Sequence, residues 1–236
     1  MTRETNTALI VGASRGLGLA IVEELAGRGW QVIGAVRDLS AATPLHDVAA
    51  RSGGRITVER LDITKPEQLP PLHSRLAGDF ETGLDVLFVN AGTTNNQETP
   101  IGSVPTSDFV DVMVTNALSP MRVIEALQDL VAPQGLIGAM TSGQGSITNN
   151  TTGSREVYRG SKAALNQFMR SFAVRQEDTD RSLLLMAPGW IKTDLGGDDA
   201  PFTMAENVPK IVDVMLAKRR APGLEYLDFR GSTVPW

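Results

Sequence analysis

Residues 7–18, Thr-Ala-Leu-Ile-Val-Gly-Ala-Ser-Arg-Gly-Leu-Gly, join a short apolar run to three closely spaced glycines. The run at 7–11 has the length of a buried strand, and apolar residues recur at helical spacing from Leu17 to Ala26. Gly12, Gly16 and Gly18 allow a tight turn between the two elements and let a ligand approach the backbone. Because a helix N-terminus presents free N–H groups and a positive dipole end, this segment predicts a pyrophosphate site. A glycine-rich turn without a ligand is the alternative.

Strand-like and helix-like segments alternate along the rest of the chain. Strands are predicted at residues 31–36, 55–63, 84–89, 136–140, 182–187 and 225–229, and helices at 43–52, 66–77, 106–131, 155–177 and 205–218. Pro120 is expected to break the 106–131 helix just after Asn116, because proline lacks an N–H donor. This alternation is typical of a doubly wound, mostly parallel sheet, here of seven strands, with helices on both faces. Since no repeat or linker interrupts the pattern, residues 1–236 are expected to form one α/β domain.

Composition excludes several classes of function. The 236 residues include 22 Lys and Arg and 27 Asp and Glu, which gives a net charge of −5, and no basic block predicts a nucleic-acid partner. No apolar run of about 18 residues predicts a membrane span. The chain has no cysteine, which excludes disulfides and thiolate catalysis. With no signal peptide predicted in the polar residues 1–6, a cytoplasmic location is expected.

Polar or turn residues follow six of the predicted strands directly. They are Gly12, Arg37, Asp62, Asn90, Ser142 and Pro188. Ligands of doubly wound folds bind at the carboxyl ends of the strands, so these residues are expected to converge on one edge of the sheet. No metal-ligand spacing appears, and His46 and His73 fall in predicted helices away from this edge. Asp62 has an alternative role as a turn or cap residue, because Asp-x-Thr favours turns.

Two arginines bear on the choice of dinucleotide. Arg37 stands 25 residues after Gly12, where an acidic residue would bind a ribose 2′-hydroxyl and an arginine a 2′-phosphate. Arg15, inside the glycine turn, is a second cation for the same phosphate. The pair favours NADPH over NADH, and the alternative is that both are ordinary surface arginines.

Tyr158 and Lys162 lie four residues apart in the predicted 155–177 helix, so a phenol and an ammonium share one face. A nearby positive charge favours the phenolate of a group whose pKa is ordinarily ~10, and this makes the phenol a usable acid or base. Chance pairs on a solvated helix face are common, so this spacing is weak evidence by itself.

Seven motifs in register resemble the short-chain dehydrogenase/reductase family over nearly the whole chain. They are Gly12-x-x-x-Gly16-x-Gly18, Asp62, Asn90-Ala91-Gly92, Asn116, Ser142, Tyr158-x-x-x-Lys162 and Pro188-Gly189. Residues 145–153, 158–166 and 188–197 more narrowly resemble C-factor-like proteins and sniffer-type carbonyl reductases. The chain departs from the family pattern at two places. Val11 stands where the family usually has threonine, and Ser142 precedes Tyr158 by 16 positions, a few more than is usual in the family. The longer loop leaves Ser146 as a less favoured candidate for the serine role.

The resemblance implies a Rossmann fold and NADPH-dependent reduction of an aldehyde or ketone. Tyr158 would donate the proton, Ser142 would orient the substrate oxygen, and Lys162 would lower the pKa of Tyr158. Asn116 would hold a water that links Lys162 to solvent. The implied cofactor contacts are Gly12, Ser14, Arg15, Gly16, Leu17, Gly18, Arg37, Asp62, Ile63, Asn90, Ala91, Gly92, Tyr158, Lys162, Pro188, Gly189, Trp190, Ile191 and Thr193.

The resemblance also implies partners. A small carbonyl or alcohol substrate is expected to contact the loops at 143–157 and 190–204, with Trp190 and Phe202 as an apolar wall. A homodimer or homotetramer would be built from the later part of the 106–131 helix and the 155–177 helix. The alternative function is a cofactor-binding regulatory protein with little turnover, which would be free to lose Ser142, Tyr158 or Lys162.

Overall fold

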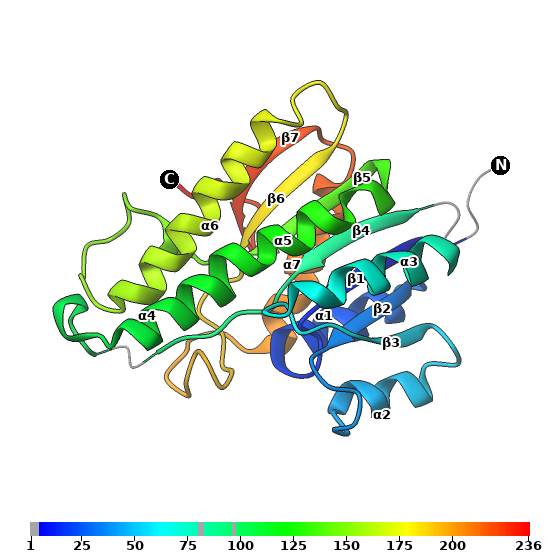
Figure 1. Cartoon of the computed structure of the whole chain (residues 1–236), viewed down its shortest axis with the longest axis horizontal. Helices are drawn as coiled ribbons and strands as arrows, with labels where there is room; N and C mark the ends of the chain where they lie inside the picture. The colour runs from blue at the N-terminus through cyan, green and yellow to red at the C-terminus, as the bar shows by residue number, and fades with distance from the viewer. Residues whose placement is uncertain (1–4, 80–82, 96–97) are drawn as a thin grey trace.

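A seven-stranded sheet forms the centre of the computed structural model, which describes residues 5–79, 83–95 and 98–236 (Figure 1). The strands are β1 (Thr7–Val11), β2 (Gln31–Val36), β3 (Ile56–Arg60), β4 (Leu84–Val89), β5 (Val131–Met140), β6 (Ser182–Ala187) and β7 (Gly223–Asp228). Their order is β3-β2-β1-β4-β5-β6-β7, and neighbouring strands pair in parallel throughout. The predicted α/β class and doubly wound sheet are confirmed.

Helices cover both faces of the sheet (Figure 1). They are α1 (Gly16–Gly27), α2 (Pro44–Arg51), α3 (Leu69–Asp79), α4 (Thr106–Met113), α5 (Ser119–Leu127), α6 (Glu156–Val174) and α7 (Met204–Lys218). Side chains alternate along a strand, so Ala8 and Ile10 of β1 pack with α1, α2 and α7, while Leu9 and Val11 pack with α3, α5 and α6. This double burial explains why β1 is apolar along its whole length.

The predicted boundaries of three strands differ from the structure. The third strand ends at Arg60 rather than 63, because Asp62 and Thr64 form a turn. The fifth strand begins at 131, five residues earlier than predicted, and the seventh spans 223–228 rather than 225–229. The predicted polar N-terminal residues 1–4, and residues 96–97 of the predicted 93–103 loop, lie outside the described residues.

The predicted break in the 106–131 helix is confirmed and takes the form of a widened π-turn. This turn, Val114–Leu118, separates α4 from α5, and the short 3-10 segment Gln128–Leu130 ends the run. Pro120 stands at the start of α5, where its missing N–H costs least. Asn116 lies inside the π-turn and is fully buried. Within the described part of the chain, no helix is long and apolar enough to cross a membrane.

Candidate active site

The glycine turn after β1 packs directly against the end of β4. The Asn90 side chain donates a hydrogen bond to the Gly12 carbonyl oxygen at 3.0 Å, and the backbone N–H groups of Asn90 and Ala91 bond the Val11 oxygen. A Cβ at Gly12 would lie 2.7 Å from Ala91, and one at Gly18 would lie 2.1 Å from the Gly12 oxygen. Both positions therefore require glycine so that this turn can close.

Gly16 shows that the other side of the turn has room for a ligand. Its φ of +57° is in the left-handed region, and nothing lies within 4 Å of the position that a Cβ would take. Ser14, Arg15 and Leu17 complete the turn that leads into the N-terminus of α1. Arg15 is exposed and pairs with Asp194 at 3.3 Å, which links the turn to the loop after β6. The turn thus has the open backbone and dipole end that a pyrophosphate needs.

The predicted adenosine-binding residues lie beyond β2 and β3. Arg37 is exposed at the end of β2, as a 2′-phosphate contact requires. The Asp62 carboxylate accepts hydrogen bonds from the Thr64 N–H at 3.0 Å and the Thr64 hydroxyl at 2.7 Å, so the predicted turn role of Asp62 is observed. The Ile63 side chain is buried in the core, which leaves only its backbone for a ligand.

Ser142 and Tyr158 meet at the end of β5. The Ser142 hydroxyl oxygen accepts a hydrogen bond from the Gln144 N–H at 3.1 Å. Tyr158 is 7 % exposed, and this burial raises its pKa, while the neighbouring Ser142 hydroxyl and the charge of Arg155 act in the opposite direction. A raised pKa keeps the phenol protonated at neutral pH, which suits a proton donor.

Lys162 lies one helical turn after Tyr158, with its Nζ 5.9 Å from the centre of the Tyr158 ring. The Nζ donates a 2.9 Å hydrogen bond to the Met140 carbonyl oxygen, and burial lowers the pKa of Lys162 to about 8. The charge of Arg155 lowers the pKa of Tyr158, and the predicted effect of Lys162 on that pKa stays a prediction.

Asn116 fastens the loop after β4 to α6. Its Oδ1 accepts from the Thr93 N–H at 2.7 Å, and its Nδ2 donates to the Thr93 oxygen at 2.8 Å and the Ser161 hydroxyl at 3.0 Å. A Cβ at Gly92 would lie 3.3 Å from Asn116 Oδ1 and 3.5 Å from Lys162 Nζ, so both polar groups border Gly92. Asn116 therefore has a structural role beside Lys162, and its predicted water-holding role stays a prediction.

Short contacts fix the shape of the loop that follows β6. The Pro188 oxygen accepts from Asn207 Nδ2 at 2.9 Å, and Gly189 has a φ of +85°. The Trp190 indole donates to the Gly196 oxygen at 2.6 Å, while Ile191 forms a bridge with Phe202. The ring of Phe202 packs on Phe229, 5.1 Å between centroids. Thr193 accepts from the Gly196 N–H at 3.0 Å, so short contacts hold the predicted substrate loop in shape.

Three residues that surround this site escaped the sequence prediction. Arg155 has a φ of +60° before α6, Asn166 accepts a 2.6 Å hydrogen bond from Thr141, and the Tyr226 hydroxyl donates to the Ser142 carbonyl at 2.5 Å. Asn166 follows Lys162 by four residues on the same helix face, and that spacing is a usable signal. The bond from Tyr226 joins residues 84 positions apart, which no local pattern reveals.

His46 and His73 have structural partners. The His46 ring completes a capping box with Thr43 at the start of α2, and the His73 ring pairs with Asp129 at 2.8 Å.

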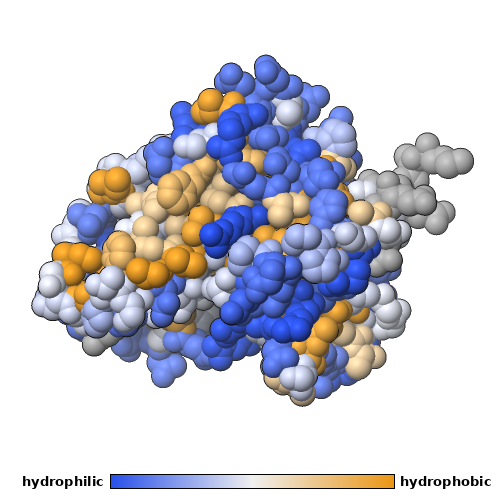
Figure 2. Space-filling view, viewed as in Figure 1, coloured by the Kyte–Doolittle hydropathy of each residue, from blue (hydrophilic) through white to orange (hydrophobic). Residues whose placement is uncertain are grey.

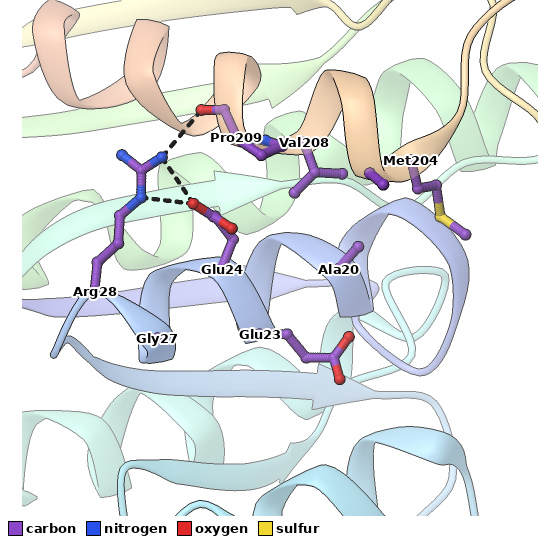
Figure 3. A pocket seen from close by; sticks show the side chains of 9 residues that line it. Ala20, Glu23, Glu24, Gly27, Arg28, Met204, Val208 and Pro209 are labelled. Atoms are coloured by element: carbon purple, nitrogen blue, oxygen red, sulfur yellow. Dashed lines mark hydrogen bonds and ion pairs between the residues drawn. The ribbon is translucent and has the colours of Figure 1, made fainter.

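A surface hollow lies outside this site, between α1 and α7 (Figure 3). It is lined by Ala20, Glu23, Glu24, Gly27, Arg28, Met204, Ala205, Val208 and Pro209. Inside it, Arg28 donates to Glu24 at 2.8 Å and to the Pro209 oxygen at 3.2 Å. None of the predicted site residues lines this hollow. The candidate site is therefore identified by the polar residues and the glycine turn at the carboxyl ends of the strands.

Known proteins are similar to this chain in both sequence and fold. The profile of the short chain dehydrogenase family matches residues 6–202. A short-chain dehydrogenase/reductase of Burkholderia multivorans, solved with bound NADP, is 57 % identical over 98 % of this chain and all of that one, with a TM-score of 0.95. The carbonyl reductase Sniffer of Drosophila melanogaster is 28 % identical over 99 % of this chain and all of that one, with a TM-score of 0.90. The C-signal protein of Myxococcus xanthus is 33 % identical over 65 % of this chain and 93 % of its own length. The chain therefore belongs to the short-chain dehydrogenase/reductase family, in a branch similar to its carbonyl reductases.

Proposed function

We propose that the protein is an NADPH-dependent reductase of aldehydes or ketones. The observation that carries this proposal is the Ser142 hydroxyl beside a protonated, buried Tyr158, at the sheet edge where the open glycine turn also lies. NADP bound to the Burkholderia multivorans relative supports the choice of dinucleotide.

The turn with Gly12, Gly16 and Gly18 would hold the pyrophosphate, with Asn90-Ala91-Gly92 and residues 188–193 along the rest of the cofactor. Arg37, supported by Arg15, would pair with the 2′-phosphate and favour NADPH over NADH. The charge-assisted contact is worth about ten- to a hundredfold in preference. Arg37→Asp should reverse the NADPH/NADH ratio of kcat/KM, and an unchanged ratio would remove Arg37 from the cofactor site.

The side chains of this site suit proton donation to a carbonyl oxygen. Bound NADPH would supply the hydride. Tyr158 would give its proton to the oxygen as negative charge develops there, and the Ser142 hydroxyl would donate a hydrogen bond to the same atom. The Lys162 ammonium, 5.9 Å from the Tyr158 ring, would stabilise the phenolate that remains.

The decisive experiment follows the absorbance of NADPH over a panel of aldehydes, α-diketones, α-keto esters and cyclic ketones, with NADH alongside. Tyr158→Phe keeps the ring but removes the proton, so kcat should fall about 10²- to 10⁴-fold. NADPH affinity of the variant, measured by fluorescence titration, shows whether the cofactor site is intact. Turnover that survives in Tyr158→Phe would contradict the proposed role.

The second candidate function is a cofactor-binding regulatory protein, and the similarity to the C-signal protein of Myxococcus xanthus favours considering it. The complete set of Ser142, Tyr158 and Lys162 favours the enzyme, since a sensor has no need of all three. Tight NADPH binding without turnover on the whole panel would support the regulatory function.

We also expect the chain to form a homodimer or homotetramer. Figure 2 shows hydrophobic residues gathered over the α4 and α6 side of the molecule, where Phe109, Val110 and Phe168 are each more than 40 % exposed. A second copy would cover this apolar area, which includes α6 as in the sequence prediction but has α4 in place of the later part of the 106–131 helix. Sedimentation analysis measures the assembly. The cytoplasmic location stays a prediction from the sequence.

A further inference from the structure

Ser142 is held by its backbone as well as by its side chain. Its carbonyl oxygen accepts two hydrogen bonds, from the Tyr226 hydroxyl at 2.5 Å and from the Gly145 N–H at 2.8 Å. Its hydroxyl oxygen accepts from the Gln144 N–H at 3.1 Å. Tyr226 comes from β7 at the end of the sheet, so one side chain from a distant strand fixes the start of the loop that carries Ser142.

Tyr226 is itself fixed among buried groups. It is 1 % exposed, and this burial raises its pKa to about 12, so its hydroxyl keeps the proton that it donates. The neighbouring Asn166 side chain acts against this rise in pKa, and it accepts from Thr141 at 2.6 Å and donates to the Gly145 oxygen at 3.4 Å. The network therefore joins β7 and α6 to both ends of the Ser142 turn.

Residues 233–236 close over Tyr226 from outside. Thr233 forms an antiparallel bridge with Leu227, and the Val234 N–H bonds the Tyr226 oxygen at 2.8 Å. The Trp236 ring then packs on the Tyr226 ring, 5.5 Å between centroids, and the Arg170 guanidinium lies 5.6 Å from the Trp236 ring centre. Trp236 thus covers the Tyr226 ring, whose hydroxyl bonds the Ser142 carbonyl.

The Trp236 backbone also binds the loop that follows Ser142. Its oxygen accepts from the Thr148 hydroxyl at 2.7 Å, from the Thr148 N–H at 3.2 Å and from the Ser146 hydroxyl at 3.5 Å. The Asn149 N–H in turn bonds the Ser146 hydroxyl at 3.1 Å. Residues 143–149 are therefore fastened at one end by Tyr226 and at the other by Trp236.

We propose that Tyr226 and Trp236 are positioning residues for Ser142. They hold the serine hydroxyl beside Tyr158, at the place where a substrate oxygen would lie. A hydroxyl that bonds a developing charge must keep its geometry to within about 0.5 Å, and a loop of small polar residues does not provide this by itself. This inference rests on the proposed reductase function for its kinetic consequence, whereas the positioning of the loop is testable without turnover.

A double-mutant cycle between Tyr226→Phe and Ser142→Ala tests the kinetic part. Tyr226→Phe keeps the ring under Trp236 but loses one hydrogen bond, so kcat should fall about tenfold with KM nearly unchanged. In the Ser142→Ala background the same substitution should change kcat by less than about twofold, because the group through which it acts is gone. Ser52→Ala is the matched control, since it removes a buried hydroxyl that bonds the Ala49 oxygen far from the site. An equal loss of kcat in both backgrounds would overturn the proposal.

Amide hydrogen exchange tests the positioning part directly. The N–H groups of residues 144, 145, 148 and 149 are bonded within this network, so Tyr226→Phe and Trp236→Ala should each speed exchange in residues 143–149 about tenfold or more. Peptides that cover β1 report global stability and should not change. Unaltered exchange in residues 143–149, or equal acceleration everywhere, would overturn the proposal. If the parent chain reduces no carbonyl, the proposed function fails, while the exchange result still decides whether Tyr226 and Trp236 hold the loop.

Discussion

Replacing Lys162 with methionine should alter the stability of the protein in a pH-dependent way. Burial lowers the pKa of Lys162 from 10.5 to about 8. One pKa unit corresponds to about 1.4 kcal/mol, so the buried ammonium costs the folded state about 3 kcal/mol at neutral pH. Methionine removes this cost, but it also leaves the Met140 carbonyl oxygen without the 2.9 Å bond, a loss of about 1–3 kcal/mol. The two effects nearly offset each other at neutral pH.

The pH dependence separates the two effects. Because the folded-state pKa lies below the unfolded value, the unfolded chain binds more protons at Lys162 between about pH 8 and 10.5. The contribution of Lys162 to the parent's free energy of unfolding therefore rises with pH across this window. Lys162→Met lacks this group, so its stability relative to the parent should fall by about 3 kcal/mol over the window.

Urea unfolding, followed by tryptophan fluorescence at several pH values across the window, measures this difference. Lys65→Met is the matched control, because Lys65 is exposed and its replacement removes an equal charge from the surface. The parent and Lys65→Met should differ by a nearly constant amount. If the difference between the parent and Lys162→Met is equally constant, the depressed pKa of Lys162, and the reasoning from its burial, would be refuted.

Three further substitutions test other parts of the site. Gly18→Ala would place its Cβ 2.1 Å from the Gly12 oxygen, so NADPH affinity in a fluorescence titration should fall about 100-fold or more. Gly16→Ala meets no atom within 4 Å, so in urea unfolding it should lower the free energy of unfolding by only about 1–2 kcal/mol, the cost of left-handed strain. A loss well above about 2 kcal/mol would contradict the room seen at Gly16. Asn116→Ala removes three hydrogen bonds from a fully buried side chain, so the free energy of unfolding should fall by about 2–4 kcal/mol. A loss below about 1 kcal/mol would show that Asn116 does not hold the loop after β4 to α6.

Local patterns were sufficient to predict the order of elements and much of the sheet edge. The apolar run at 7–11 and the helical spacing after Gly18 depend on neighbours within a few residues, and the structure has a strand and a helix there. The boundaries were less predictable. Val131 pairs with Leu84 before a register shift in β5, and this lengthens the strand beyond its predicted start at 136.

The sequence alone therefore established the α/β class, the glycine turn and the Tyr158–Lys162 spacing, because each is a matter of short-range periodicity. The tertiary structure decided where the polar atoms of the site point. Lys162 bonds Met140, 22 residues away, Asn116 bonds Thr93, 23 residues away, and Tyr226 bonds Ser142, 84 residues away. The direction of each side chain and the pKa of each buried group depend on which atoms surround it after folding. Those surroundings are set by the packing of distant strands and helices, which local sequence does not encode.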